Sequence, residues 1–129
     1  MPNKILIPKG ASLKDTYSYG IVVPLGDKEM IFVTGQIAAK NGEAVAPNNI
    51  EEQTEYVFKA VNDILKAGNS SLDDVAKVVI YLRDIKDFPK VSPIRNKFFK
   101  KAKPVSTLVE ISNLVRKGCD IEIDVIAVR

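Results

Sequence analysis

The feature that most constrains the fold of this chain is a series of strand-length apolar runs interrupted by only two helical segments. Strands are predicted over Lys4–Ile7, Tyr17–Leu25, Glu29–Gly35, Val75–Leu82, Ser106–Ser112 and Cys119–Val128. The helical segments lie before and after the fourth of these strands. The element order β-β-β-α-β-α-β-β predicts an α+β fold with two helices on one face of a sheet. The 129 residues fit a single domain, 1–129.

Turn and capping residues set the predicted boundaries. The pairs Gly26–Asp27 and Asn41–Gly42 predict tight turns. Asn49 with Glu52 three residues later has the pattern of a capping box, which predicts the start of the first helix. Gly68 predicts its end.

The second helix is predicted to begin at Ser92 as N-cap, with Pro93 at the first helical position, and to run to about Lys101. Around it lies a basic run without an acid: Lys90, Arg95, Lys97, Lys100, Lys101 and Lys103. One interpretation is an RNA or phosphate contact. The other, which we favour, is a solvated helix face, because the adjacent Phe98 and Phe99 require at least one aromatic ring to face the core.

The last predicted strand indicates how the sheet is buried. One of its faces carries Ile121, Ile123, Val125 and Ala127, and the other carries Glu122, Asp124, Ile126 and Val128. Several other strands are apolar on both faces, whereas two helices can cover only one. A bare apolar face would exceed the patch size that monomers usually tolerate. We therefore predict an obligate homo-oligomer that buries this face against copies of the same chain.

The composition excludes several kinds of chemistry. The chain has no His, one Cys and a net charge of +3. Ser-His-Asp and Cys-His nucleophile systems, His-ligated zinc and internal disulfides are therefore excluded, and no metal or cofactor is predicted. Cys119 is expected to be a small buried strand residue. The weak net charge does not indicate a nucleic-acid partner, and without an apolar span or signal peptide a cytoplasmic protein is expected.

Three carboxylates are candidates for function. Glu122 lies between two isoleucines of a buried strand, where a carboxylate is costly unless it is hydrogen-bonded or functional. A carboxylate pointing into solvent at a strand end fits the pattern equally well. Asp124 lies about 7 Å along the same face and could pair with it, although a solvated or subunit-bridging charge is favoured. Glu110 is interpreted as a structural charge.

Residues 104–112 (PVSTLVEIS), followed by the triplet Ile121-Glu122-Ile123, resemble the signature of the Rid (YjgF) family, which is also named endoribonuclease L-PSP or translation-initiation inhibitor. That signature is a Pro, a small residue, an Arg, a small residue, an alternating strand and an apolar-Glu-apolar triplet. The resemblance extends over nearly the whole chain. Further positions that look like family positions are Tyr17, Gly20, Val33–Ile37, Asp87-Phe88 and Ala127–Arg129.

The resemblance implies a chorismate-mutase-like fold, a homotrimer whose sheets form a central barrel, and a small-molecule pocket at each seam between subunits. It implies hydrolysis of 2-imino acids and their enamine tautomers, such as 2-iminobutanoate, to 2-oxo acids and ammonia without a cofactor. Glu122 is the implied catalytic residue, which orients or activates water. The implied substrate-binding residues are Tyr17, Thr34, Gly35, Phe88, Ser92 and Ser106.

The sequence departs from this signature at Ser106, which occupies the position of the Arg, and at Ser92, where the deaminase branch often has Asn. The Arg would hold the substrate carboxylate by two charge-assisted hydrogen bonds of about 1.5 to 3 kcal/mol each. Its loss would therefore lower substrate affinity or reaction rate on the order of a hundredfold or more. Efficient deamination therefore requires Arg95, Arg116 or a Lys to reach the pocket from a neighbouring subunit. The cleft is otherwise expected to hold an acidic group and no cationic clamp.

Two functions remain open: weak or altered imine and enamine hydrolysis, and a non-catalytic trimer that binds a metabolite or a protein. The ligand implied in the first case is a 2-imino or 2-oxo acid. RNA binding or cleavage is a lesser alternative. Without His, metal-free RNA cleavage has poor candidates for the general base and the general acid.

Overall fold

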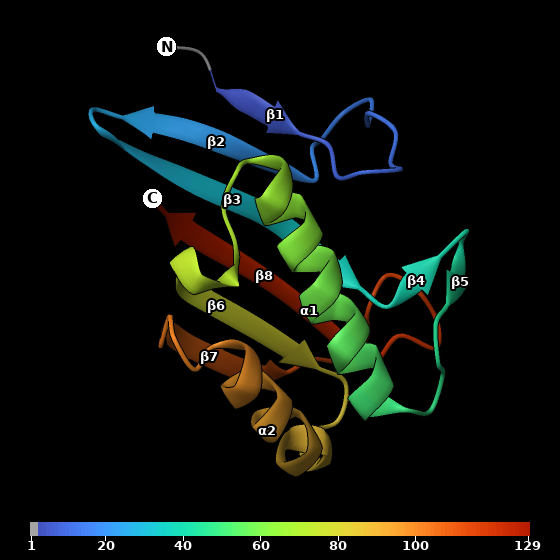
Figure 1. Cartoon of the computed structure of the whole chain (residues 1–129). Coiled ribbons are helices and arrows are strands. Elements are labelled where there is room, and N and C mark those ends of the chain that lie inside the picture. The colour runs from blue at the N-terminus through green and yellow to red at the C-terminus, as the bar shows by residue number, and fades with distance from the viewer. Residues whose placement is uncertain (1–2) are drawn as a thin grey trace.

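The structure is a computed structural model that describes residues 3–129 (Figure 1). Its elements in chain order are β1 (Lys4–Leu6), β2 (Gly20–Leu25), β3 (Lys28–Ile37), β4 (Ala39–Lys40), β5 (Glu43–Ala44), α1 (Ile50–Ala67), β6 (Val75–Leu82), α2 (Phe88–Phe98), β7 (Val105–Glu110) and β8 (Ile121–Val128). Short 3-10 turns, Leu72–Asp74 and Ile85–Asp87, precede β6 and α2. The fold is α+β, as the element order predicts.

Six strands form one mixed sheet in the order β1-β2-β3-β8-β6-β7. All neighbours are antiparallel except β6 and β7, which are parallel. The parallel pair arises because α2 carries the chain back along the sheet between these two strands. The last strand of the chain, β8, is inserted between β3 and β6, so Glu122 lies on a strand at the centre of the sheet.

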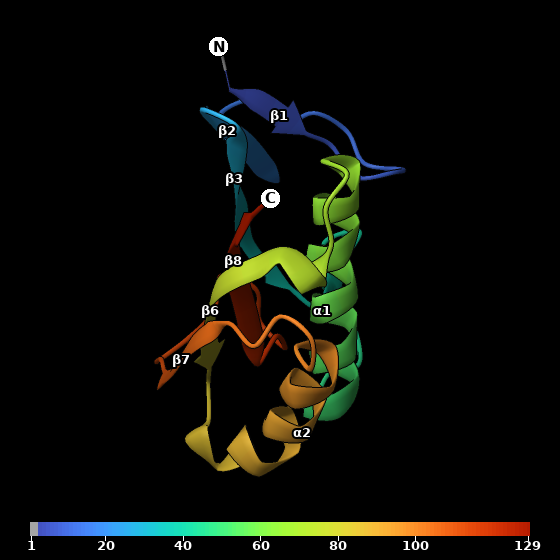
Figure 2. The same cartoon turned by 60° about the vertical axis from the view of Figure 1, so that its left-hand side comes forward.

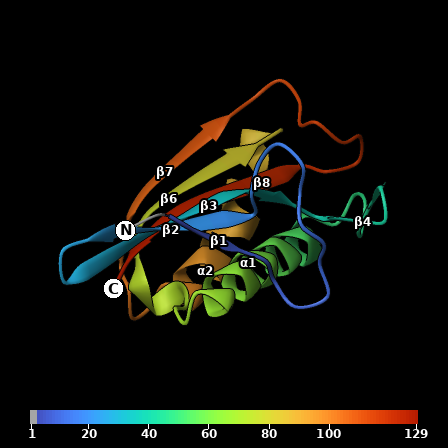
Figure 3. The ribbon, with the colours of Figure 1, turned by 90° about the horizontal axis from the view of Figure 1, so that it is seen from above.

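Both helices pack on one face of the sheet, and no helix of residues 3–129 covers the other, which we call the bare face (Figure 2). The view from above shows the same two layers (Figure 3). Ile121, Ile123 and Ala127 are fully buried beneath the helices, whereas Glu122 and Asp124 face the other side. The two faces of the last strand are therefore divided as predicted.

The core is built from the inner face of the sheet and the apolar stripe of α1. Phe58 of α1 stacks on Phe98 with ring centroids 4.9 Å apart and meets Phe99 edge to face at 5.3 Å. Phe99 is buried. The prediction that an aromatic of the basic run faces the core is confirmed. No helix in the described part of the chain is long and apolar enough to cross a membrane.

The first helix and the turns lie where the sequence predicts them. The Asn49 side chain accepts a hydrogen bond from the Glu52 N–H at 3.0 Å and donates one to the Glu52 carboxylate at 3.3 Å. Gly68 is the C-cap residue of α1. The pair Gly26–Asp27 joins β2 to β3, and Asn41–Gly42 joins β4 to β5.

The predicted start of the second helix is wrong. The helix begins at Phe88, one turn before Ser92, and Pro93 lies inside it. An earlier proline, Pro89, already occupies the first turn, where a missing N–H costs no intrahelical bond. Pro93 therefore removes one interior hydrogen bond. The helix also ends earlier than predicted, at Phe98.

Several predicted strands differ at their ends. The second strand begins at Gly20, and the last begins at Ile121, so Cys119 lies in the loop before it. Cys119 is fully buried, and its thiol donates to the Ala38 carbonyl at 3.4 Å. Burial raises the pKa of this thiol. Cys119 is therefore a small buried residue, as predicted, but it is not a strand residue.

Candidate functional site

A β-bulge in β3 shapes the backbone beside Glu122. The register of β3 on β8 shifts between Val33 and Gln36, so Thr34 and Gly35 together face one residue of β8. Bulges bend a strand, re-aim side chains and are frequent next to active sites. A Cβ on Gly35 would lie 2.8 Å from the Glu122 Cδ, a separation that folded proteins essentially never show. The absence of a side chain at Gly35 therefore makes room for the Glu122 carboxyl.

Three hydrogen bonds hold the bulge in place. The Thr34 N–H donates to the Tyr19 carbonyl at 2.8 Å, and the Thr34 hydroxyl donates to the Ser18 carbonyl at 2.5 Å. The Gln36 amide donates to the Thr34 carbonyl at 2.8 Å. The two Thr34 bonds bind the segment before β2 to the bulge, and Tyr17 of this segment lines the same hollow as Glu122.

A hollow of about 360 Å³ lies beside the bulge. It is similar in volume to other hollows on this surface, which measure about 380 to 480 Å³. We call it the Glu122 cleft. It is lined by Lys14, Tyr17, Tyr19, Thr34, Gly35, Gln36, Ile37, Ala39, Val115, Arg116 and Glu122. Of the predicted site residues, the structure therefore brings together Tyr17, Thr34, Gly35 and Glu122.

The Glu122 cleft also contains two cations of its own chain, a difference from the expected acidic cleft without a cationic clamp. The Lys14 ammonium lies 5.6 Å from the ring centroid of Tyr17 and 5.1 Å from that of Tyr19, within range of a cation–π interaction. Arg116, on the loop before β8, lines the same cleft. Within residues 3–129, neither cation forms an ion pair with Glu122. The sequence pattern could not place these two loop residues.

The environment of Glu122 changes its acidity. Burial raises the pKa of Glu122 above its ordinary value of 4.5, and the negative charge of Asp124 raises this pKa further. Asp124 itself accepts a hydrogen bond from the Tyr81 hydroxyl at 3.0 Å. Glu122 is thus suited to exchange a proton closer to neutral pH than an ordinary carboxyl. Across the described residues, no three His, Cys, Asp or Glu side chains are grouped so as to hold a metal ion.

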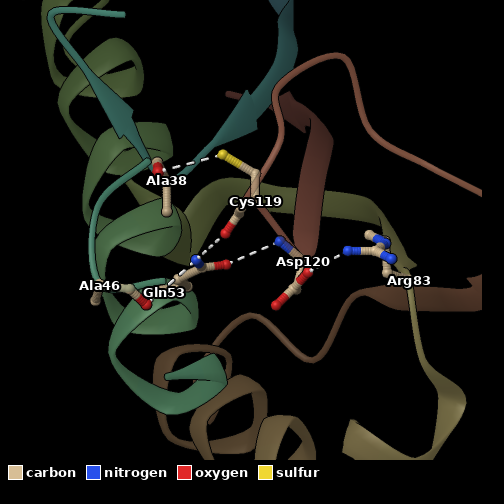
Figure 4. A network of polar contacts seen from close by, with 7 residues as sticks. Ala38, Ala46, Gln53, Arg83, Cys119 and Asp120 are labelled. Carbon is tan, nitrogen blue, oxygen red and sulfur yellow. Dashed lines mark hydrogen bonds and ion pairs between the residues drawn. The ribbon is translucent and has the colours of Figure 1, made fainter. Parts of the chain in front are cut away.

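A buried amide fixes the loop that leads into β8 (Figure 4). Gln53 of α1 is fully buried and donates to the carbonyls of Gly118 at 2.7 Å and Ala46 at 3.3 Å. Its side-chain oxygen accepts from the Asp120 N–H at 2.9 Å. Because Glu122 follows Asp120 by two residues, this network sets where the carboxyl enters the cleft. Sequence reasoning missed Gln53, although its place within the apolar stripe of α1 was a usable signal.

Ser106 lies on the opposite face of the sheet from Glu122. Ser106 pairs with Val78 of β6, which is fully buried under the helices, and paired residues on neighbouring strands point to the same face. Glu122 pairs with Tyr81, which points to the bare face. Within one chain, therefore, Ser106 and Glu122 do not form one site.

The remaining predicted site residues gather around Arg95 of α2. The Arg95 Nη2 donates to the Ser92 hydroxyl at 3.3 Å, and the guanidinium carbon lies 5.7 Å from the ring centroid of Phe88. A hollow of about 380 Å³, which we call the Arg95 hollow, lies between α2 and the start of β7. It is lined by Arg95, Asn96, Phe99, Lys100, Lys103, Pro104 and Ser106. The candidate site is thus divided into two groups.

Part of the basic run is neutralised by acids of the same chain. Lys97 pairs with Glu55 of α1 at 2.5 Å, and Lys101 approaches Asp73 at 3.9 Å. These two lysines are therefore structural charges on the helix-covered side. Because two of its six basic residues are paired with acids, the basic run offers fewer unpaired positive charges to RNA than the sequence suggests.

The chain is similar to known proteins in both sequence and structure. The sequence profile described as Endoribonuclease L-PSP matches residues 11–129. A RutC family protein of Saccharolobus solfataricus is 42% identical over 113 residues, covering 86% of this chain and 85% of the relative. Yeast Mmf1, a solved structure, has a TM-score of 0.86 at 30% identity and covers 99% of both chains. E. coli TdcF, solved with bound serine, has a TM-score of 0.81 at 29% identity and covers 98% of both chains.

Proposed function

Because this chain belongs to the endoribonuclease L-PSP family, also called the RutC, YjgF or Rid family, we propose that it is an imine and enamine hydrolase working at the seams of a homotrimer. Its substrates are small 2-imino acids of the 2-iminobutanoate type, and no cofactor takes part. The observation that carries the proposal is the Glu122 carboxyl, partly buried over the Gly35 bulge with a raised pKa.

The raised pKa of Glu122 suits both halves of the reaction. In its acid form, Glu122 donates a proton to the imine nitrogen, which makes the imine carbon electrophilic. The resulting carboxylate accepts a proton from the water that attacks this carbon. Glu122 then passes this proton to the amino group, the carbon–nitrogen bond breaks and releases ammonia, and the hydroxyl proton returns to Glu122 as the 2-oxo acid forms. Tyr17 and the bulge at Thr34 border the space in which the substrate lies.

The bare sheet face supports the homotrimer. Apolar side chains on this face are strongly exposed in the single chain, with Val105 at 69%, Leu25 at 51%, Val109 at 40%, Val128 at 39% and Phe32 at 37%. Burying them against further copies removes an apolar patch that would otherwise face water. We propose a chorismate-mutase-like arrangement in which the three sheets form a central barrel. In that assembly the Glu122 cleft of one copy meets residues of the next.

Binding without catalysis is the second candidate function. The solved TdcF holds serine, which supports a small amino acid or 2-oxo acid as the ligand of this chain. Ser106 cannot hold a carboxylate as a guanidinium does. In this case Glu122 serves as a hydrogen-bonding group for a metabolite or for a partner protein.

Other sequence-based predictions stay proposals. RNA binding is the weakest, because two lysines of the basic run are paired with acids. We place the protein in the cytoplasm, although one yeast relative, protein MMF1, is named mitochondrial. We also treat residues 1–129 as one domain.

A competition assay tests the hydrolase. An amino-acid oxidase generates 2-iminobutanoate in the presence of a trapping reagent, and the protein competes with the trap by hydrolysing the imine. We expect Glu122→Gln to lower the rate about a hundredfold or more, because it removes the proton exchange. Glu43→Gln, an exposed carboxylate on β5, is the matched control and should be unchanged. Equal rates for the wild type, Glu122→Gln and a sample without protein would leave only the binding function.

A further inference from the structure

The Arg95 hollow collects positive charge without an acid. Arg95, Lys100 and Lys103 line it, and none of its lining residues is acidic. Within residues 3–129, none of these three cations forms an ion pair, whereas Lys97 and Lys101 of the same run do. The positive potential of the hollow is therefore not cancelled locally and favours an anion.

The guanidinium of Arg95 is already oriented. Its Nε donates to the Asn96 side chain at 3.2 Å, its Nη2 donates to the Ser92 hydroxyl at 3.3 Å, and it lies over the Phe88 ring. A guanidinium has five N–H groups, so these two bonds leave three for a ligand. Three are enough for the two parallel bonds that a carboxylate accepts. Because the group is held in advance, less side-chain entropy is lost when a ligand binds.

The hollow also has an apolar part. The Phe99 ring and the Pro104 ring line it beside the cations, and Ser106 contributes only a short side chain. A volume of about 380 Å³ is within the range of small-molecule sites. An anion with a short hydrocarbon chain therefore fits this lining better than inorganic phosphate, which has no apolar surface to bury.

We propose that the Arg95 hollow binds the carboxylate of a small organic acid with a short apolar chain, and that Arg95 is the residue that selects for this carboxylate. The inference rests on the proposed function for its substrate and deepens it. Arg95 on α2 supplies the guanidinium that Ser106, which lines the same hollow, does not supply from β7.

Isothermal titration of the full chain with butanoate tests the proposal, with butanamide as the neutral analogue. Butanoate should bind at least about tenfold more tightly than butanamide, and Arg95→Gln should weaken butanoate about tenfold or more. Arg95→Lys keeps the charge but not the planar fork, so it should fall between the two. Lys97→Gln is the control, because Lys97 of the same helix pairs with Glu55 and does not line the hollow. This variant should bind butanoate as tightly as the wild type does.

A rescue variant separates the role of the guanidinium from a fault in folding. Adding Ser106→Arg to Arg95→Gln returns a guanidinium to the same hollow, now from β7. The double variant should therefore regain most of the butanoate affinity that Arg95→Gln loses. Equal butanoate affinity in the wild type and Arg95→Gln overturns the proposal, as does the absence of binding. Phosphate binding more tightly than butanoate overturns the carboxylate assignment.

The two proposals fail in different ways. Butanoate binding that depends on Arg95, without any imine hydrolysis, contradicts the hydrolase and leaves the anion site standing. Hydrolysis with a KM for 2-iminobutanoate that is unchanged in Arg95→Gln contradicts the anion site and leaves the hydrolase standing.

Discussion

The two faces of the sheet carry different kinds of candidate site. On the bare face, the Glu122 cleft holds a carboxyl with a raised pKa beside a glycine bulge. On the helix-covered face, the Arg95 hollow holds an oriented guanidinium and no acid. Glu122 and the oriented guanidinium of Arg95 therefore lie on opposite faces of the sheet within one chain, although Lys14 and Arg116 also line the Glu122 cleft.

This separation explains why the association of subunits matters for the proposed function. A 2-imino acid presents an imine nitrogen and a carboxylate on adjacent carbons, so both groups must reach the substrate at once. One chain holds Glu122 and Arg95 on opposite faces of the sheet. In the proposed assembly the two groups can meet where the edge of one copy, formed by α2 and the edge strand β7, reaches the Glu122 cleft of the next copy. We therefore expect hydrolase activity to depend on the assembly.

The largest effect is expected when the bare face is made polar. Phe32→Glu places a charge among apolar side chains that the proposed trimer buries, where an unpaired charge is costly. The variant should be monomeric by analytical ultracentrifugation and should have no detectable hydrolase activity. Ile85→Glu changes an exposed apolar residue of similar accessibility outside the sheet and should keep both properties. A fully active monomer would separate activity from the assembly.

The next effect concerns the bulge. Gly35→Ala forces the Glu122 carboxyl away, so kcat should fall by about ten- to a hundredfold. The free energy of unfolding should change by no more than about 1 kcal/mol, because the end of the Glu122 side chain can rotate away from the added Cβ. Steady-state kinetics and urea denaturation measure the two effects. A kcat for Gly35→Ala equal to that of the wild type would contradict the role of the contact.

The smallest effect is on the pH dependence of stability. Burial and the charge of Asp124 raise the pKa of Glu122 above 4.5, so the folded chain binds this proton more tightly than the unfolded chain does. The stability from this proton is complete below the ordinary pKa and is lost as pH rises through the raised pKa. Glu122→Gln cannot lose this proton. The free energy of unfolding of the variant, relative to that of the wild type, should therefore increase as pH rises above 4.5. A difference that does not change with pH in urea denaturation would contradict the raised pKa.

Local signals in the sequence predicted the parts of the fold that depend on neighbouring residues. The start of α1 follows from the Asn49 side chain, and the hairpin between β2 and β3 follows from Gly26–Asp27. The start of α2 was misplaced because two prolines, Pro89 and Pro93, both fit a first turn and only one occupies it. Glu110 was correctly interpreted as structural, since it accepts the Ile85 N–H at 2.9 Å.

The features that the sequence could not supply depend on long-range pairing. The insertion of β8 between β3 and β6 determines which residues face Glu122. The bulge at Gly35 appears only once the register against β8 is known. The grouping of Ser106 with Arg95 likewise follows from the parallel pairing of β7 with β6. Sequence reasoning therefore found candidate residues without finding that they lie in two groups.

Subunit mixing tests most directly whether the site is shared between copies. Arg95→Gln and Glu122→Gln chains, which we expect to have reduced activity at low substrate concentration, are mixed in equal amounts, unfolded and refolded together. Among all trimers assembled at random from equal amounts of the two variants, about a quarter of the seams pair an intact Arg95 from one copy with an intact Glu122 from the next. We expect the activity of the refolded mixture to rise well above the sum of the activities of the two variants. A mixture that stays at that sum, while containing mixed trimers, would contradict it.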